Sequence, residues 1–524
     1  MPGPGMVEAT SDADLQRIAE TGMLVAHWAR VRPDAPAVLS SRGNRSYREL
    51  NAAANRLARV LREAGLRPGN GIALVCPNTP EFIETLCAAQ RAGLRLTPVN
   101  WHLTGPEIGY IVENSEAKAV VVHGELGDKV ADLPLAATRI ALSIGADVDG
   151  FDRYETRLAA ADDSDIADPV LGSQMLYTSG TTGRPKGVRR HKEVVATPAV
   201  ARALGDYGDD SVSLLSGPAY HASPIFIDIA LPLAAGAPVV MMERFDPEEA
   251  LRLIERHRVT NAHMVATMFQ RLLRLSDAVR TRYDLSSLRV VPHGAAPTPR
   301  DVKRAMIDWW GPVLLEYYAA TEGGGDIRIT SEEWLRKPGS VGRIDRAGTR
   351  IFDAEGAECP AGVTGAVHFS RASAGFDYFK APASSDADSS TFYTVGDMGF
   401  VDEDGYLFLT GRTAECIISG GVNIYPAEID AAFAQHPAVQ DVCTIGIPNA
   451  EWGEEVRTVV ALAPGFAGSA ELAADLIDFA RPSLASFKLP KTIDFVDSLP
   501  RSEAGKIQRQ LVRAPYWKGH KASI

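Results

Sequence analysis

The stretch YTSGTTGRPKGV, Tyr177 to Val188, places three glycines, four serine and threonine hydroxyls and two cations within twelve positions. Glycines let successive backbone N–H groups point toward one spot and form a nest for an anion. The hydroxyls and the Lys186 ammonium add donors and charge to the same loop. The pattern is not a Walker A loop, which requires GxxxxGK followed by serine or threonine. It predicts a phosphate-binding loop, and the alternative is a solvated surface loop.

The overall composition is that of a globular protein. The chain has 524 residues, of which 45% are hydrophobic and 23% are charged, and this length allows roughly three to four domain-sized units. A formal net charge of −12 argues against a general nucleic-acid surface, which would be basic. We therefore expect no nucleic-acid partner; a local cationic site for an anionic small molecule and a homodimer are left open.

Cysteine usage and apolar runs indicate the cellular setting. The five cysteines are scattered and form no CxxC pair, so neither a disulfide framework nor a zinc site is indicated, and a reducing compartment is expected. The first residues lack the regions of a signal peptide. The longest apolar run without a charge, residues 229–242, has 14 residues including Pro232 and Pro238, too few and too broken to span a bilayer. These features predict a soluble, cytoplasmic protein.

Strand-like and helix-like segments alternate through the first part of the chain. Residues 46–66 have the period of an amphipathic helix, and Ser46 with Glu49 forms a capping box at its start. This alternation predicts a large N-terminal domain of parallel α/β sheets. The apolar runs that read as buried strands are 71–76, 117–124, 237–243 and 287–296.

The pattern of predicted helices and strands changes after residue 340. Shorter strands between glycine-rich turns, such as 365–370 and 406–412, predict a β-rich subdomain. After Arg412 a helix from Pro426, a strand at 439–447 and a helix at 471–480 predict a small α+β C-terminal domain. We place the domains at 1–411 and 412–524.

Further motifs follow the glycine-rich loop in a fixed order. They are PAYHASP (218–224), HGAAP (293–297), YYAATEGG (317–324), TVGDMG (394–399), GRTAECIISGGVNIYPAEID (411–430) and PRSEAGKIQR (500–509). Together with Tyr177–Val188 they resemble the signatures of the adenylate-forming superfamily, in particular its acyl-CoA synthetases. The resemblance covers nearly the whole chain. It implies a ligase that uses ATP, Mg²⁺ and coenzyme A, and a C-terminal domain that moves.

The resemblance implies that ATP binds across segments that are far apart in the sequence. The glycine-rich loop and Thr321 would contact the phosphates, while Tyr318 and residues 294–296 would hold the adenine. The implied nucleotide-binding residues are Thr178, Ser179, Gly180, Thr181, Thr182, Gly183, Lys186, Gly294, Ala295, Ala296, Tyr318, Ala319, Thr321, Asp397, Arg412 and Lys506. For a lone tyrosine such as Tyr318, core packing is the alternative.

The chemistry brings a carboxylate against a triphosphate, so positioning and charge neutralisation must dominate. Mg²⁺ prefers oxygen ligands together with substrate phosphates, and the resemblance places the metal at Glu322 and Thr178. For a glutamate taken alone, a helix start or a turn is the alternative. The implied catalytic residues are Lys506, Glu322, His221 and Thr178.

Asp397 and Arg412 can also be related by counting along the chain. Asp404-Gly405 is a hairpin turn signal, and counting outward from a tip at these two residues pairs Asp397 with Arg412. A longer loop would shift the pairing by a residue or two. The resemblance assigns both residues to the ribose, whose hydroxyls the carboxylate would accept. The alternative is a surface ion pair, which is worth little.

Two segments of the C-terminal domain would act in turn, as the resemblance implies. Lys506, next to Gly505, would deliver its ammonium to the adenylation step, and the alternative is a solvated basic tail. A rotation just after Arg412 would then present Ser419, Gly420 and Gly421 to coenzyme A. Many relatives carry aspartate or lysine where this chain has Ala414, so Ala414 as the hinge is a weaker assignment.

The motif PAYHASP bears on the acid. Amino-acid-activating relatives place an aspartate after its aromatic residue, whereas here His221 is followed by Ala222, so a simple carboxylic acid is expected. His221 would act as a gate, with a core histidine as the alternative. The implied substrate-binding residues are His221, Ala222, Ile225, Phe226, Tyr317 and Ala319. These mostly apolar residues, joined by Gly294 and Ala295 in the pocket wall, favour a fatty, branched or steroid-side-chain acid; paired polar groups for a hydroxybenzoate are not evident.

Three other functions remain open. An acyl-AMP ligase would hand its product to a carrier protein, but the sequence shows neither a carrier module nor the insertion before the hinge that is common in such relatives. An aryl-acid CoA ligase would differ only in its acid. A catalytically silent nucleotide-binding protein would be expected to have lost Lys506 or Glu322, and both are present.

Overall fold

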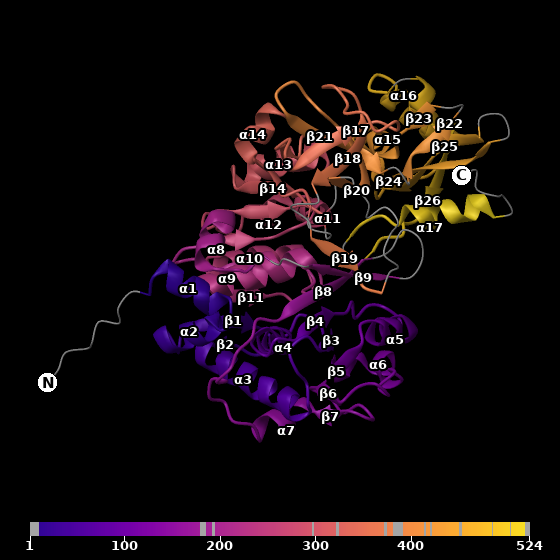
Figure 1. The fold of residues 1–524 in the computed structure, drawn as a ribbon. Helices are drawn as coiled ribbons and strands as arrows, with labels where there is room; N and C mark the ends of the chain where they lie inside the picture. Colours follow the sequence, from indigo (N-terminus) through magenta and orange to yellow (C-terminus); the bar gives the residue numbers. More distant parts are fainter. Residues whose placement is uncertain are drawn as a thin grey trace.

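The fold is known from a computed structural model (Figure 1). The described residues are 10–178, 185–190, 194–295, 298–320, 324–370, 375–380, 391–412, 415–419, 422–449, 453–484, 486–502 and 505–518. At Thr178 and Arg412 only the backbone is described. None of the helices in these ranges has the length and apolar character needed to cross a membrane.

The largest sheet in the described part has the order β19-β9-β8-β4-β3-β5-β6-β7. Neighbouring strands from β8 through β7 run parallel, whereas β9 and β19 are antiparallel additions at one edge. The strands are β3 (Gly71–Val75), β4 (Arg95–Pro98), β5 (Ala117–His123), β6 (Ile140–Ile144), β7 (Asp152–Arg153), β8 (Ser173–Thr178), β9 (Lys186–Arg190) and β19 (Phe376–Tyr378).

Helices of the same region include the predicted amphipathic one. Helix α3 begins after Ser46, whose side chain accepts from the Glu49 N–H while Glu49 accepts from the Ser46 N–H, so the capping box is confirmed. Its apolar face packs in a core shared with β3 and α4. The helices are α3 (Tyr47–Glu63), α4 (Pro80–Arg91), α5 (Gly105–Asn114), α6 (Asp128–Ala131) and α7 (Tyr154–Ala159), with a short 3-10 turn η1 (Gly124–Leu126).

Two further sheets complete the α/β part. One has the order β12-β10-β11-β1-β2 and the other β13-β14-β15; isolated parallel bridges Asn261↔Val290 and Met264↔His293 connect them. Their strands are β1 (Pro36–Ser40), β2 (Arg45–Ser46), β10 (Ser213–Leu215), β11 (Val239–Met241), β12 (Asn261–Ala262), β13 (Val291–His293), β14 (Leu314–Tyr318) and β15 (Ile327–Thr330). The parallel α/β prediction is therefore confirmed, with antiparallel strands at the sheet edges.

Nine helices and one π-helical segment accompany these sheets in the described ranges. They are α1 (Asp12–Ala19), α2 (Leu24–Val31), α8 (Pro198–Gly205), the π-helix η2 (Pro224–Ala230), α9 (Leu231–Ala235), α10 (Pro247–His257), α11 (Ala266–Leu273), α12 (Asp277–Arg280), α13 (Arg300–Trp310) and α14 (Ser331–Arg336). The segment η2 continues directly into α9. A π-helix is rare and is often found at functional sites, so η2 marks a region to inspect.

The predicted β-rich subdomain is an antiparallel sheet with the order β16-β21-β20-β18-β17. Its core includes Val367, Phe369 and Leu407. The strands are β16 (Gly342–Arg343), β17 (Thr349–Phe352), β18 (Gly365–Ser370), β20 (Phe392–Val401) and β21 (Tyr406–Arg412).

The last part of the chain has a core of its own, built around Phe433, Val460 and Leu476. Figure 1 shows this part in yellow, beside the sheet that contains β20 and β21. Its sheet has the order β23-β22-β25-β24, and β26 pairs with β25. The elements are β22 (Ile417–Ser419), β23 (Val422–Ile424), α15 (Pro426–Phe433), β24 (Val439–Asn449), β25 (Gly453–Leu462), α16 (Ala470–Ala480), η5 (Ser486–Lys488), β26 (Thr492–Val496), α17 (Arg509–Arg513) and η6 (Ala514–Trp517).

Candidate active site

The end of β14 carries two adjacent tyrosines that face different surroundings. Successive residues of a strand point to opposite faces. The Tyr318 hydroxyl donates to Asp397 Oδ2 at 2.7 Å, whereas the Tyr317 hydroxyl donates to Ser223 Oγ at 2.8 Å. One short strand therefore links the residues predicted for the ribose with those predicted for the acid.

The predicted pairing of Asp397 with Arg412 is present, but the hairpin that makes it differs from the expected one. The loop holds Glu403 to Gly405 rather than two residues, because the Asp402 N–H donates to the Tyr406 carbonyl. That extra residue shifts the register by one. A β-bulge shifts it back, since Met398 pairs with Gly411 but Gly399 pairs with Leu409. Asp397 thus lies opposite Arg412 and is 9% exposed.

The loop predicted to hold adenine begins with a crowded glycine and a strained alanine. A Cβ on Gly294 would lie 2.6 Å from the Tyr317 carbonyl oxygen and 2.8 Å from its ring Cζ, so only glycine fits there. Ala295 has φ +64°, a left-handed conformation that is uncommon for residues with a side chain. Such strain clusters at functional sites. The predicted neighbour Ala319 is exposed.

The ends of the glycine-rich loop are held together by strand pairing. Thr178, the last residue of β8, pairs with Lys186, the first of β9. Lys186 is exposed, with its ammonium 5.4 Å from the centroid of the Tyr378 ring. The other predictions for this loop, and several elsewhere, lie outside the described residues: Ser179, Gly180, Thr181, Thr182, Gly183, Ala296, Thr321, Glu322, Ala414, Gly420 and Gly421. Ser419 ends β22, where it pairs with Val422.

The loop that carries Lys506 is tightly built. The Ser502 N–H donates to the Lys506 carbonyl at 2.7 Å, and the Lys506 N–H donates back to Ser502 Oγ at 3.2 Å. Arg501 anchors this loop to the C-terminal sheet by donating to both carboxylate oxygens of Asp441, at 2.7 and 3.0 Å. The backbone around Lys506 is thereby fixed although its side chain is exposed.

The same loop lies against the large domain. Gly505 has φ +74°, and a Cβ there would lie 2.5 Å from Thr267 Oγ1 in α11. The charge of Lys506 reaches His221: burial and then this ammonium lower the pKa of His221 to about 4. His221 is therefore a neutral imidazole near pH 7. The structure thus brings the predicted lysine and the predicted gate residue together.

Two buried ionisable residues near His221 were missed by the sequence analysis. The backbone N–H of His263 donates to Asp228 Oδ1 at 3.1 Å, and His263 Nε2 lies 2.9 Å from the Tyr317 hydroxyl. Asp228 and His263 are 1% and 3% exposed. Burial raises the pKa of Asp228 well above its ordinary value and, with the positive charge of protonated His221, lowers the pKa of His263 to about 4. Asp228 is an isolated polar residue in an apolar run, a signal that a buried partner exists.

A cavity of about 190 Å³ has Ala222, the residue after His221, in its wall. Ala222 and Phe226, both predicted for the acid, line it, whereas Ile225 is fully buried in the main core. Further walls come from α1, α2, α4, β8, β9 and α9. The lining residues that the later argument uses are Leu24, Val25, Leu86, Ala222, Phe226 and Ala230.

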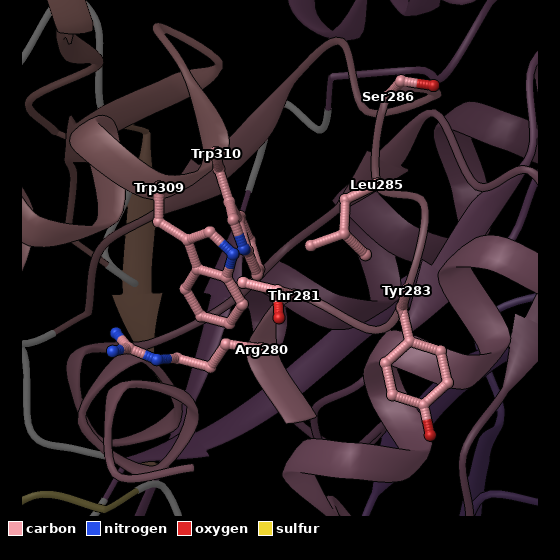
Figure 2. Close-up of a pocket in the computed structure, with 7 residues that line it drawn as sticks. All are labelled: Arg280, Thr281, Tyr283, Leu285, Ser286, Trp309 and Trp310. Atoms are coloured by element: carbon pink, nitrogen blue, oxygen red, sulfur yellow. The ribbon is translucent and has the colours of Figure 1, made fainter. Parts of the chain in front are cut away.

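A second, open hollow of about 410 Å³ lies elsewhere, where α12 and the residues after it meet the end of α13 (Figure 2). Its walls include Arg280, Tyr283, Trp309 and Trp310. The Trp310 indole N–H has no partner among the described residues, yet it is shut off from solvent. None of the predicted site residues lines this hollow, so the candidate site is the region around His221 and Asp397.

Comparison with known proteins identifies the family. Residues 25–379 match the family model described as AMP-binding enzyme, and residues 428–506 match that of the AMP-binding enzyme C-terminal domain. The chain belongs to the AMP-binding enzyme family. It is an adenylate-forming enzyme of the acyl-CoA synthetase type, as the seven motifs implied.

Relatives with different names cover almost the whole chain. A fatty acid–[acyl-carrier-protein] ligase of Streptomyces coeruleorubidus is 30% identical over 521 residues, which are 96% of this chain and 97% of the relative. A feruloyl-CoA synthase of an Amycolatopsis species is 32% identical over 492 residues, or 93% and 96%. The crystal structure of ATP-bound MatB from Rhodopseudomonas palustris superposes with a TM-score of 0.82 at 29% identity, covering 95% of this chain and all of that one.

Proposed function

We propose that this AMP-binding enzyme activates a hydrophobic carboxylic acid as acyl-AMP and transfers it to coenzyme A, with release of AMP and pyrophosphate. The observation that carries the proposal is the end of β14. Tyr318 bonds Asp397 on one face, and Tyr317 bonds Ser223, two residues after His221, on the other. Nucleotide and acid would therefore meet across this strand, at the side where Lys506 arrives.

In the first step a carboxylate oxygen of the acid attacks the α-phosphorus of ATP. The new oxygen–phosphorus bond replaces the one to pyrophosphate, which leaves. In the second step the thiol of coenzyme A attacks the acyl carbon, loses its proton, and AMP leaves. The Lys506 ammonium would neutralise charge between the carboxylate and the α-phosphate during the first step, and its loop is already packed on α11 through Gly505.

The nucleotide would be held by the residues that the motifs assign to it. Asp397 is a nearly buried carboxylate that can accept from ribose hydroxyls, with Arg412 opposite it. The crowded backbone at Gly294 and Ala295 would approach the adenine, with Ala296, Tyr318 and Ala319 beside it. Thr178, Ser179, Gly180, Thr181, Thr182, Gly183, Lys186 and Thr321 would contact the phosphates.

Glu322 with Thr178 would hold Mg²⁺. Carboxylate and hydroxyl oxygens are donors that Mg²⁺ accepts in combination with phosphates. The two described ends of the segment that contains Glu322 lie together, because the Ala320 N–H donates to the Gly324 carbonyl at 2.8 Å. Bound there, the ion would offset the negative charge of the phosphates.

The surroundings of His221 favour a simple acid over an amino acid. An amino acid would require an anion to bind its ammonium. Burial raises the pKa of Asp228, the carboxyl group that accepts from the backbone N–H of His263, and so favours its uncharged form. Ala222 follows His221 where an aspartate would serve. Lys506 instead brings a positive charge toward His221, and this charge suits a carboxylate substrate.

The transfer step would use a second orientation of the C-terminal module. The separate core around Phe433 and Leu476 supports a module that moves as a unit, with domains at 1–411 and 412–524. In that orientation Ser419, Gly420 and Gly421 would face coenzyme A, while Lys506 would leave its place beside His221.

Lys506→Ala separates the two steps and tests the proposal. The variant should lose acid-dependent exchange of pyrophosphate into ATP, while it still forms thioester from supplied acyl-AMP and coenzyme A. The control is Lys491→Ala, at an exposed lysine that contacts Glu455. This variant should retain both activities. Retained exchange in Lys506→Ala would remove the assigned role of this lysine, and absence of acid-dependent exchange in the wild type would remove the function.

A carrier protein is the second candidate for the acceptor, favoured by the relative from Streptomyces coeruleorubidus. Coenzyme A and a phosphopantetheinyl carrier present the same thiol group, so the site chemistry does not separate them. Measuring AMP release with each acceptor in turn separates the two candidates. Dependence on coenzyme A supports the proposal, and turnover only with a carrier protein would replace the acceptor while leaving the adenylation step intact.

A further inference from the structure

Tyr317 is held in place from three sides. Its hydroxyl donates to Ser223 Oγ at 2.8 Å and lies 2.9 Å from His263 Nε2. Its ring and carbonyl cover Gly294 so closely that a Cβ there would lie 2.6 to 2.9 Å from them. The ring therefore fills the space between β13, β14 and the start of η2, and it cannot swing aside without breaking both hydrogen bonds.

The support behind Tyr317 is a string of polar groups. Asp228 Oδ1 accepts from the backbone N–H of His263, and Asp228 Oδ2 lies 3.7 Å from His263 Nδ1. Because the Tyr317 hydroxyl donates to Ser223, His263 must donate from Nε2, which leaves Nδ1 unprotonated toward Asp228. Burial disfavours the charged forms of both His263 and Asp228, so the string that holds Tyr317 suits an anionic substrate. His263 and Asp228 act here as positioning residues.

The cavity of about 190 Å³ has neither Tyr317 nor His263 in its wall. Ser223 bonds Tyr317, whereas its neighbour Ala222 lines the cavity, followed by Phe226, Ala230 and Ala234 at spacings of four along η2 and α9. Leu24, Val25 and Leu86 form a further part of the wall. Tyr317 thus closes the space next to Gly294, whereas Ala222 borders the cavity.

The size of the cavity limits the occupant. Its volume is about 190 Å³. Since an apolar cavity of roughly 150 Å³ holds one benzene molecule, this cavity has room for roughly eight carbon atoms. The walls named above are aliphatic or aromatic, which suits a hydrocarbon. Gln90, Gln174 and Arg190 supply the polar part of the lining.

We propose that Tyr317 is a specificity-determining partition: it closes the space beside Gly294 and directs the acid's tail past Ala222 and Phe226 into the cavity. The substrate class is then a carboxylic acid with a slender hydrocarbon tail of roughly eight carbons, rather than an acid whose ring begins next to the carboxylate. This inference rests on the proposed function, because it assumes that the carboxylate lies at His221 and Lys506.

The test compares kcat/KM for AMP release across straight-chain acids from butanoate to hexadecanoate and ring-bearing acids such as benzoate and cinnamate. Wild type should prefer decanoate to both butanoate and cinnamate. Ala230→Leu, which adds three carbon atoms to the cavity wall, should lower the decanoate-to-butanoate ratio by roughly tenfold or more. Tyr317→Ala should raise the cinnamate-to-decanoate ratio by a similar factor, because it opens the space over Gly294, and Tyr317→Phe should keep the wild-type order.

Tyr207→Phe is the matched control. Tyr207 is also a buried tyrosine whose hydroxyl bonds a serine, Ser213, and the η2 carbonyl of Ile227, but it does not line the cavity. Its loss should leave all ratios unchanged. Wild-type preference for cinnamate, or a chain-length profile that Ala230→Leu does not move, would overturn the inference even if Tyr317→Ala fails to fold. AMP release with none of the acids would instead remove the proposed function.

Discussion

The substitution Gly505→Ala should weaken the packing of the loop that carries Lys506 against the large domain. Gly505 has φ +74°, and an added Cβ would lie 2.5 Å from Thr267 Oγ1 and 3.0 Å from Thr267 Cγ2. A left-handed backbone costs a residue with a side chain about 1–2 kcal/mol. The contact with Thr267 also requires the loop to retreat by roughly 1 Å, a displacement that can cost about 100-fold in rate. Both effects favour conformations in which the loop that carries Lys506 no longer packs against α11.

The expected result is a selective loss. The strain alone corresponds to about tenfold in rate, so acid-dependent pyrophosphate exchange should fall by roughly 10² to 10³-fold. Thioester formation from supplied acyl-AMP should persist, because that step does not require Lys506 beside His221. Isotope exchange into ATP and a thioester assay, run on one preparation, measure the two steps separately.

Two further variants separate the contact from the backbone strain. Gly465→Ala is the control, since Gly465 also has a positive φ, +93°, but has no atom within 4 Å of an added Cβ; exchange should stay at the wild-type rate. Thr267→Ala removes Oγ1 and Cγ2, so combined with Gly505→Ala it should recover about tenfold. Wild-type exchange in Gly505→Ala would refute the view that this docked arrangement is the adenylating one.

Two more predictions concern Asp397 and His263. Asp397→Asn removes the charged acceptor proposed for the ribose, so KM for ATP should rise by about 10 to 100-fold while the melting temperature changes little; an unchanged KM would contradict the ribose role. His263 has a folded-state pKa of about 4, below its unfolded value, so from pH 6.5 down to 4 the unfolded chain binds the extra proton and stability falls as the pH falls. Denaturant titrations should find a loss of about 2–3 kcal/mol at pH 4.5 relative to pH 7, and a shallower pH slope in His263→Phe; equal slopes would contradict burial of a neutral imidazole.

The sequence was sufficient to predict the structure of those segments whose conformation a local rule determines. The capping box at Ser46 and Glu49 and the apolar runs of β3 and β5 need no knowledge of distant residues, and both are present. Motif order gave the family because each motif is short and chemically constrained. The roles of the residues in those motifs stay predictions, and for Glu322 and most of the glycine-rich loop they concern residues outside the described ranges.

The contacts among Asp228, His263 and Tyr317 could not be predicted from local rules. Asp228 lies in the apolar run PIFIDIAL, His263 lies on the far side of β11 and α10 in the sequence, and Tyr317 comes later still. Each residue taken alone resembles a polar interruption of a core segment. Only the meeting of η2 with β14 shows that these residues contact one another.

The hairpin at Asp397 shows how a correct pairing can rest on an incomplete reason. A two-residue tip and a regular ladder pair Asp397 with Arg412, and so do a three-residue loop and one bulge. In the first case neither strand has an extra residue, whereas in the observed one β21 has an extra residue that offsets the longer loop. The bulge places Thr410 without a partner in the ladder next to Gly411, whose φ is +144°. Deleting Thr410 should therefore move Arg412 out of register with Asp397 and turn the following residues to the other face, because the loop length and the bulge together set the position of Arg412.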